Sequence, residues 1–331
     1  MYVTKPSLDR EFRCLTSACP DTCCAGWEIP VDEDSAERLR ALDGALGERL
    51  REALVQADGE WQFARQNGRC VLLNGENLCD LYAACGEGSL CRTCYLHPRF
   101  VAQYGGRREV MAGLSCPAWI ETYLLSRETV TFVTEETDEP ICDYTDIDAA
   151  LFFRLTKARE KAIAIAQTRT LTIRERLEQL LALGEELDGA EGVCPQSGVM
   201  AAYLAKLRSL ELLTDTWRDA LQTAQKCVKK QEISPYLLEK VLVYDLFRFF
   251  LKGVYDGRVL PWIKLAVFRI LVICAVAGGL KTEREQAEII RIYSKEIEHN
   301  AANMDALHRV LLRRSGRWSA DGLRRGMEEV L

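Results

Sequence analysis

The spacing of apolar side chains divides the chain into two dissimilar parts. From about residue 147 onward, apolar residues recur every three or four positions, as in TIRERLEQLLALGEEL before Gly189. This is the period of an amphipathic α-helix. The pattern continues through MAAYLAKLRSLELLTDTWRDALQTAQKCV and returns in TEREQAEIIRIYSKEIEH. Short loops between such helices favour an antiparallel helical bundle.

The most apolar stretch of the chain predicts the centre of that bundle. It reads YLLEKVLVYDLFRFFLKGVYDGRVLPWIKLAVFRILVICAVAGG. Its second half, residues 261–280, is the strongest candidate for a membrane span. Lys264 and Arg269 interrupt it, whereas a spanning helix needs about 20 largely uncharged residues. We therefore expect a buried helix and no association with a membrane.

Residues 1–145 lack this periodicity and are predicted to form short elements joined by loops. One helix is expected within residues 32–57, where helical spacing follows an acidic first turn. The stretches CVLLNG and EVMAGLSC predict short strands or extended segments that carry cysteines at their ends. The acidic, proline-containing segment TEETDEPICDYTD, residues 134–146, predicts the domain boundary. The expected fold class is mainly α, with an irregular N-terminal domain over residues 1–145 and a helical-bundle domain over residues 146–331.

Length, composition and charge narrow the class of protein. The 331 residues are enough for two ordinary domains, and 48% of them are hydrophobic. The net charge of -6 gives no reason to expect nucleic acid as a partner. The opening MYVTKPSLDREFRC lacks the basic start and apolar run of a secretory signal. We therefore expect a cytoplasmic protein.

The cysteines are concentrated near the start of the chain, where ten of the fourteen lie within the first 116 residues. The cytosolic thiol pool reduces ordinary structural disulfides, so metal ligation is the usual role of such a group. Cys91 and Cys94 have the CxxC spacing of a metal knuckle. The leading run from Cys14 to Cys24 is Cx4Cx3CC, which suits zinc poorly, because zinc sites often use two CxxC pairs. The spacing favours an iron–sulfur cluster over zinc, and zinc over thiol redox chemistry, and leaves all three open.

Two other residues lie beside these cysteines. His97, in CYLHPRF, is a candidate ligand, although a histidine in a loop near a metal site is the more ordinary interpretation. Trp27 follows Cys23-Cys24 and is expected to shield a metal loop from water rather than to stack on a cofactor. No G-x-G-x-x-G loop between a strand and a helix, P-loop, G-x-S-x-G or H-E-x-x-H motif occurs. Any catalytic chemistry is therefore expected in the cysteine-rich part.

The first 32 residues then point to a known family. The stretch YVTKPSLDREFRCLTSACPDTCCAGWEIPVD resembles the opening of the bacterial flagellin lysine-N-methylases. The blocks GRCVLLNGENLC, CYLHPR and LSCP resemble later cysteine blocks of that family, and TIRERLEQLLALG resembles one of its helical blocks. The resemblance is specific across residues 2–120, apart from a gap at 30–65, and is weaker but collinear beyond. The same cysteine pattern resembles a broader group of zinc- or iron-chelating domains.

The resemblance implies an activity and a cofactor. Members of the family are protein-lysine N-methyltransferases that transfer methyl groups from S-adenosylmethionine to lysine amines of flagellin in the cytoplasm. Their cysteine blocks are associated with an iron–sulfur cluster, expected here to be 4Fe-4S, with zinc as the alternative metal. Cys85 and Cys91 lie outside the matching blocks. Carried over position by position, the implied ligand pool is Cys14, Cys19, Cys23, Cys24, Cys70, Cys79, Cys94 and Cys116.

Eight thiolates exceed the four that one four-iron cluster takes, so either two metal sites exist or some of the eight are structural. The sequence names no residue for catalysis or for binding S-adenosylmethionine. A second hypothesis therefore stays open, namely a non-catalytic zinc- or iron-binding module on a helical scaffold, used for metal handling or protein docking. The absent nucleotide-binding loop favours this second hypothesis, and the collinear helical part disfavours it.

Overall fold

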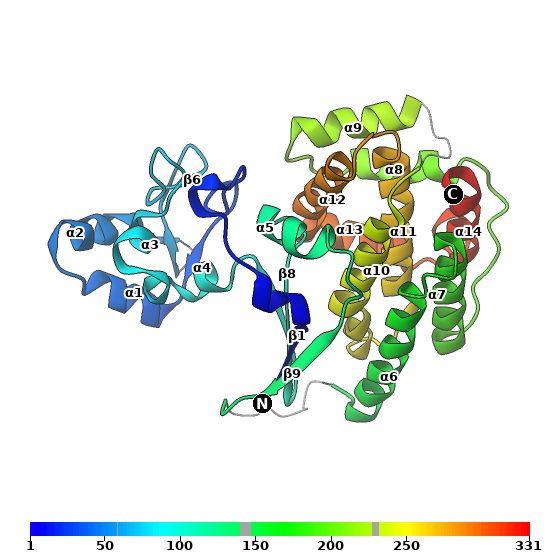
Figure 1. Cartoon of the computed structure of the whole chain (residues 1–331), viewed down its shortest axis with the longest axis horizontal. Helices are drawn as coiled ribbons and strands as arrows, with labels where there is room; N and C mark the ends of the chain where they lie inside the picture. The colour runs from blue at the N-terminus through cyan, green and yellow to red at the C-terminus, as the bar shows by residue number, and fades with distance from the viewer. Residues whose placement is uncertain (58, 140–146, 227–231) are drawn as a thin grey trace. The chain divides into compact units, whose positions relative to one another are not determined.

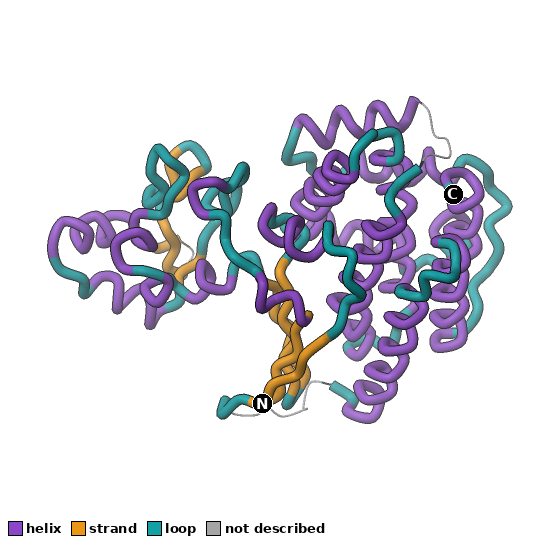
Figure 2. The backbone as a smooth tube through the Cα atoms, viewed as in Figure 1, coloured by secondary structure: helices purple, strands orange, loops and turns teal. Residues whose placement is uncertain are grey.

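The structure, a computed structural model, describes residues 1–57, 59–139, 147–226 and 232–331. It is mainly α, as the sequence predicts (Figure 2). The chain separates into two compact units, which we call the helical unit and the cysteine-rich unit. The helical unit comprises residues 1–11, 101–115 and 119–331, and the cysteine-rich unit comprises residues 12–100 and 116–118. The domain boundary predicted after residue 145 lies outside the described residues.

The long helices of the helical unit follow one another along the chain, as the apolar period predicts (Figure 1). The 3-10 helices η5 (Phe250–Val254) and η6 (Gly316–Trp318) lie between them. The α-helices are α6 (Ala149–Ala166), α7 (Ile173–Asp188), α8 (Val199–Arg208), α9 (Asp215–Lys226), α10 (Pro235–Phe249), α11 (Leu260–Ala277), α12 (Glu283–Glu298), α13 (Ala301–Leu311) and α14 (Ala320–Val330).

Helix α11 lies at the centre of this unit, in contact with α7, α8, α9, α10, α12, α13 and α14 (Figure 1). It is long and apolar enough to cross a membrane, yet 89% of its 18-residue apolar window is buried inside the protein. This confirms the prediction of a buried helix. Its two charges are buried as ion pairs: Lys264 lies 2.9 Å from Glu191, and Arg269 lies 2.6 Å from Asp245.

Local sequence sets where two of the amphipathic helices begin. Thr172 before α7 and Thr282 before α12 each form a capping box with a glutamate three residues later. Each box satisfies backbone N–H groups that the first helical turn leaves without partners. Helix α7 ends at Gly189, which has a φ of +86°. Both helices therefore occupy the stretches in which the sequence predicts them.

The helical unit also contains a four-stranded sheet, built from β1 (Tyr2–Pro6), β7 (Arg99–Tyr104), β8 (Arg107–Ala112) and β9 (Phe132–Glu136). The strand order is β7-β8-β1-β9. Strand β1 pairs in parallel with β8 and antiparallel with β9, with Tyr2 opposite Glu136. Strand β8 confirms the strand predicted in EVMAGLSC. Two short helices of this unit, η1 (Ser7–Glu11) and the π-helix η4 (Ile120–Leu124), contact each other. The short helix α5 (Pro117–Trp119) begins in the cysteine-rich unit and ends in the helical unit.

The cysteine-rich unit consists of short elements, as expected. The single helix predicted within residues 32–57 is wrong. The chain forms two helices and then a strand, because Asp43 is extended and Gly44 has a φ of +77°, which interrupts helical geometry. The elements of this unit are η2 (Thr16–Ala18), β2 (Pro30–Val31), α1 (Glu33–Arg40), α2 (Gly44–Ala53), β3 (Leu54–Ala57), β4 (Glu60–Phe63), β5 (Arg65–Gln66), β6 (Arg69–Cys70), α3 (Asp80–Cys85), η3 (Glu87–Ser89) and α4 (Arg92–Leu96).

The core of this unit mixes aliphatic side chains with cysteines. Leu39 and Leu50 bring α1 and α2 to it, and Phe63 brings β4. Cys70 and Cys91 belong to the same buried cluster, and other cysteines pack against it. The prediction for CVLLNG is wrong beyond its first residue, because β6 ends at Cys70 and turns follow. These turns carry the chain from Cys70 to the cysteines that come next.

Candidate metal centre

Six cysteines of the cysteine-rich unit interact with one another, and one of them, the exposed Cys23, also interacts with Cys19. The backbone begins this arrangement: the N–H of Cys70 donates to the carbonyl of Cys24 at 2.8 Å, which joins strand β6 to the loop after η2. Cys79 and Cys91 precede α3 and α4 as their N-cap residues. We call these six residues the inner thiols: Cys23, Cys24, Cys70, Cys79, Cys91 and Cys94.

Several of the inner thiols change the pKa of one another. The pKa of Cys94 is raised by its hydrogen bond to Cys91, by burial, and by charge on neighbouring thiols that include Cys24 and Cys79. The pKa of Cys24 is raised by its hydrogen bond to Cys23, by burial, and likewise by charge on Cys79. Cys24, Cys79 and Cys94 also pack against the same buried core.

Two of the inner thiols favour the thiolate form. The hydrogen bond from Cys24 lowers the pKa of Cys23 to about 7, although burial opposes this. The hydrogen bond from Cys94 likewise lowers the pKa of Cys91 to about 7, again against burial. A thiolate is the form of cysteine that binds metal. Near neutral pH, each hydrogen-bonded pair therefore offers one sulfur ready to coordinate.

Backbone N–H groups also point at these sulfurs. The N–H of Leu72 donates to the sulfur of Cys70. Cys79 accepts from the N–H groups of Leu81 and Tyr82. Each contact lowers the pKa of the thiol, although burial, the larger effect, raises it overall. Hydrogen bonds from N–H to sulfur stabilise negative charge on metal-bound thiolates and tune iron–sulfur clusters.

Trp27 and His97 lie beside the inner thiols. Their rings stack with centroids 5.5 Å apart and planes 24° from parallel. The Trp27 indole N–H donates to the carbonyl of Cys23 at 2.9 Å, and this side chain packs against the cysteine-containing core. Burial lowers the pKa of His97 to about 4, so its imidazole is neutral at physiological pH. The indole therefore adjoins the thiols, and its role as a shield stays a prediction.

The other predicted ligands lie around this group. Cys14 is exposed, accepts from the N–H of Thr16 at 3.4 Å, and precedes η2. Cys19 follows η2 and is half-buried, and charge on both Cys14 and Cys23 contributes to raising its pKa, after burial. Cys116 is half-buried and directly precedes α5. Five of the eight predicted ligands are therefore inner thiols.

The sixth inner thiol is one that the family resemblance leaves out. Cys91 is fully buried, whereas Cys85, which the resemblance also leaves out, is exposed at the end of α3. The CxxC spacing of Cys91 and Cys94 is the sequence signal that identifies it. The structure therefore distinguishes two cysteines that family comparison treats alike.

The inner thiols suit a soft metal or an iron–sulfur cluster in their chemistry, because all six donors are sulfur and several accept backbone N–H groups. In the described residues, no three Cys, His, Asp or Glu side chains already converge at metal-binding distances. The sulfurs instead satisfy one another in hydrogen-bonded pairs. Binding would require the thiols to lose protons and turn toward a shared centre, as metal binding generally does.

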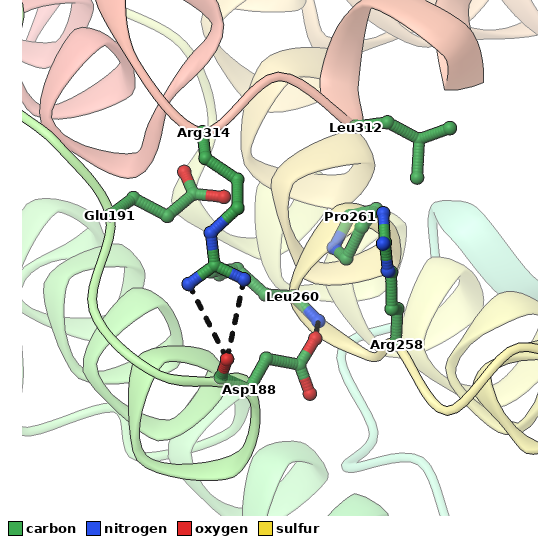
Figure 3. Close-up of a pocket in the computed structure, with 7 residues that line it drawn as sticks. All are labelled: Asp188, Glu191, Arg258, Leu260, Pro261, Leu312 and Arg314. Carbon is green, nitrogen blue, oxygen red and sulfur yellow. Dashed lines mark hydrogen bonds between the residues drawn. The ribbon is translucent and has the colours of Figure 1, made fainter.

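The helical unit has a small pocket, which lies where the end of α7, the start of α11 and the segment after α13 meet (Figure 3). Its polar groups bind the backbone of the chain itself. Asp188 accepts from the N–H groups of Val259 and Leu260, both at 2.7 Å. Arg314 donates to the carbonyl of Asp188, as the dashed lines show. These contacts hold the helix ends together, and we assign no ligand to this pocket.

Comparison with known proteins relates the chain to lysine methylases. Residues 198–323 match the family model of the FliB lysine N-methylase C-terminal domain. The chain is 29% identical over 122 residues to a lysine-N-methylase of Salmonella choleraesuis (strain SC-B67), which is 35% of this chain and 30% of that protein. It is 28% identical over 122 residues to the flagellar biosynthetic protein FliU of Salmonella muenchen, which is 35% of this chain and 72% of that protein.

These matches confirm the resemblance to the flagellin lysine-N-methylase family, and the family model covers residues 198–323. The match spans 30% of the Salmonella choleraesuis lysine-N-methylase. The family model begins at the start of α8, so the inner thiols lie outside it. No solved structure is similar to the chain.

Proposed function

We propose that the protein is a cytoplasmic protein-lysine N-methyltransferase that methylates flagellin with S-adenosylmethionine. The observation that carries the proposal is the match of residues 198–323 to the C-terminal domain of FliB lysine N-methylase. The relatives named lysine-N-methylase and flagellar biosynthetic protein support the same activity and substrate. The proposal includes neither nucleic acid nor a membrane as a partner.

The reaction moves one methyl group between two heteroatoms. The neutral lysine amine attacks the methyl carbon of the sulfonium, a C–N bond forms as the S–CH3 bond breaks, and S-adenosylhomocysteine leaves. The methylated ammonium then releases a proton to solvent or to a base. A lysine has an unperturbed pKa near 10.4, so the enzyme must desolvate or deprotonate it before attack.

The inner thiols are the proposed cofactor site. The residues that would hold a 4Fe-4S cluster come from this group, with Cys91 and Cys94 supplied by one turn and Cys70 and Cys79 by two neighbouring segments. A cluster held by only three of these thiolates would leave an iron open to the amino-acid end of S-adenosylmethionine, whereas one held by four would supply only an electron. Buried apolar neighbours in the same core, Leu72 and Leu81 among them, surround the two buried thiols, Cys70 and Cys91.

One structural observation favours a second candidate function. Cys70 and Cys91 belong to the hydrophobic core of their own unit. A metal there would hold the short elements of that unit together, as structural zinc does in small domains. The alternative is therefore a non-catalytic zinc- or iron-binding module on a helical scaffold, used for metal handling or protein docking.

Methyl transfer to flagellin separates the two functions. The anaerobically purified chain is incubated with methyl-labelled S-adenosylmethionine and purified flagellin, and modified lysines are located by mass spectrometry. The proposal predicts labelled flagellin and retention of S-adenosylmethionine by the purified protein. Absence of both, in a preparation that retains its metal, would leave the metal-binding module as the function.

A further inference from the structure

Strand β9 forms one edge of the sheet in the helical unit, and its outer side has no strand beside it among the described residues. We propose that this edge docks an extended, lysine-bearing segment of the protein substrate, which adds to the sheet as a further strand. The inference rests on the proposed function and deepens it, because it names how the substrate is held. Addition of a strand to an exposed sheet edge is a recurring mode of peptide recognition.

The hydrogen bonds between β1 and β9 show which backbone groups remain available. The N–H of Thr137 donates to the carbonyl of Met1 at 2.8 Å, and the N–H of Ser7 donates to the carbonyl of Thr131 at 2.9 Å. Bonded and non-bonded pairs alternate along an antiparallel ladder. Odd-numbered residues of β9 therefore bond to β1, and the N–H and C=O groups of Thr134 and Glu136 face the open edge.

The side chains leave this edge accessible. Every residue from Val133 to Glu136 is exposed, and Val133 retains 43% of its accessible surface. The preceding residue fixes the strand to the helices, because the rings of Phe132 and Phe247 stack with centroids 4.4 Å apart. The strand is therefore anchored at its beginning and open along the rest of its length.

The charge at this edge selects a cationic partner. Glu135 pairs with Lys5 at 3.2 Å, and its side chain is still 58% exposed. Glu136 and Asp138 form no ion pair within the part of the chain that the structure describes. Successive side chains of a strand point to opposite faces, so Glu135 and Glu136 offer a carboxylate on each face. Lysines of an added strand would meet a carboxylate on either side.

The same charges make a second copy of this chain a poor occupant. Pairing β9 with another β9 would bring carboxylates against carboxylates, which is unfavourable across strands. A lysine-bearing segment has the opposite charge and therefore satisfies both the backbone groups and the side chains. Among the two occupants, charge complementarity favours the substrate.

A proline substitution tests the backbone part of the proposal. Thr134→Pro removes an N–H that points to the open edge, and proline is tolerated at such an edge position. Thr134→Val is the matched control, because both variants lose the 2.9 Å hydrogen bond between the Thr134 and Thr4 hydroxyls. We expect Thr134→Pro to weaken flagellin binding, measured by calorimetry, and to raise KM about tenfold relative to Thr134→Val, with kcat unchanged.

Charge reversal tests the electrostatic part of the proposal. The double variant Glu136→Lys, Asp138→Lys should raise KM and reduce its dependence on salt, whereas Glu160→Lys, at an exposed position of α6, should not.

Unchanged binding and KM in both edge variants, with an active wild type, overturn the docking proposal and leave the methylase function standing. A wild type that binds flagellin without methylating it contradicts the function alone. If the double variant only changes self-association in size-exclusion chromatography, the carboxylates merely protect the edge and the proposal is wrong.

Discussion

Cys91 is fully buried just before α4, and Cys94 lies within that helix, where it packs against the same core. Cys91 and Cys94 belong to one CxxC turn, and the other inner thiols come from three other segments of the chain. The turn includes the one inner thiol that the family resemblance omits. The pair therefore provides a test of whether the structure or the resemblance identifies the metal ligands better.

Replacing Cys91 should remove bound metal. Cys91→Ser takes away a sulfur that favours the thiolate form, and we expect the purified variant to lose most of the iron or zinc found in the wild type. Cys85→Ser is the control, because Cys85 is exposed at the end of α3. Metal content is measured by elemental analysis together with the visible spectrum. Equal metal in Cys91→Ser and the wild type would show that this thiol is only part of the core.

Much of the helical unit could be predicted from the sequence, because its signals are local. Thr172 and Thr282 begin their helices with capping boxes, and a glycine ends α7. The apolar run around Lys264 predicts a buried helix, and burial of the lysine against Glu191 explains how a charge is accommodated there. Such signals depend on neighbours within one or two turns of the chain.

The sheet and the exact thiol group could not be predicted in this way. Strand β1 pairs with β9 across about 130 residues, and five-residue strands have no local signal that selects a partner. The break at Gly44 is visible in sequence only as a glycine within a helical pattern. Spacing identifies Cys91 and Cys94 as a pair, but which distant cysteines join them depends on how the loops fold.

Removing only one partner of a buried ion pair should lower the stability of the protein strongly. Arg159 of α6 donates two hydrogen bonds to Glu109 of β8, at 2.6 and 2.5 Å, and both side chains are at most 5% exposed. Arg159→Met leaves an uncompensated buried carboxylate, and we expect a loss of about 3–5 kcal/mol in the free energy of unfolding. Adding Glu109→Met should recover part of that loss. Chemical denaturation checks both variants, and a double variant less stable than the single one would contradict this reasoning.

Stability should rise with pH through the titration of Lys240. This side chain is fully buried, with its amine over the Tyr123 ring, and burial lowers its pKa to about 8 from an ordinary value of 10.5. Between these values the unfolded chain binds more protons than the folded one, so the wild type gains stability as pH increases. Lys240→Met lacks this group.

We therefore expect the thermal midpoint of the wild type, relative to that of Lys240→Met, to increase between pH 8 and 10 in the presence of a thiol reductant. The comparison cancels the effects of other titrating groups that the two proteins share. A difference that stays constant over this range would show that the buried amine titrates normally, and one that decreases would show that folding raises its pKa; either result contradicts the prediction.

The contact between α7 and α11 depends on the absence of a side chain at Gly184. A Cβ atom there would lie 2.7 Å from Leu260 Cδ1 and 3.0 Å from Ile263 Cδ1. Gly184→Val should therefore lower the free energy of unfolding by about 1–3 kcal/mol, because packed cores resist added volume. Ala182→Val is the control on the same helix, at an exposed position. Similar free energies of unfolding in the two variants would mean that α7 and α11 can move apart without destabilising the protein.

The metal content of the wild type tests the central claim most directly, namely that the inner thiols bind one metal cofactor that serves methyl transfer. The full chain is purified without oxygen, and iron, sulfide and zinc are measured per chain alongside the visible spectrum. The account predicts about four irons with matching sulfide and a brown chromophore. Zinc without sulfide would contradict it, since the thiols would then hold a structural metal.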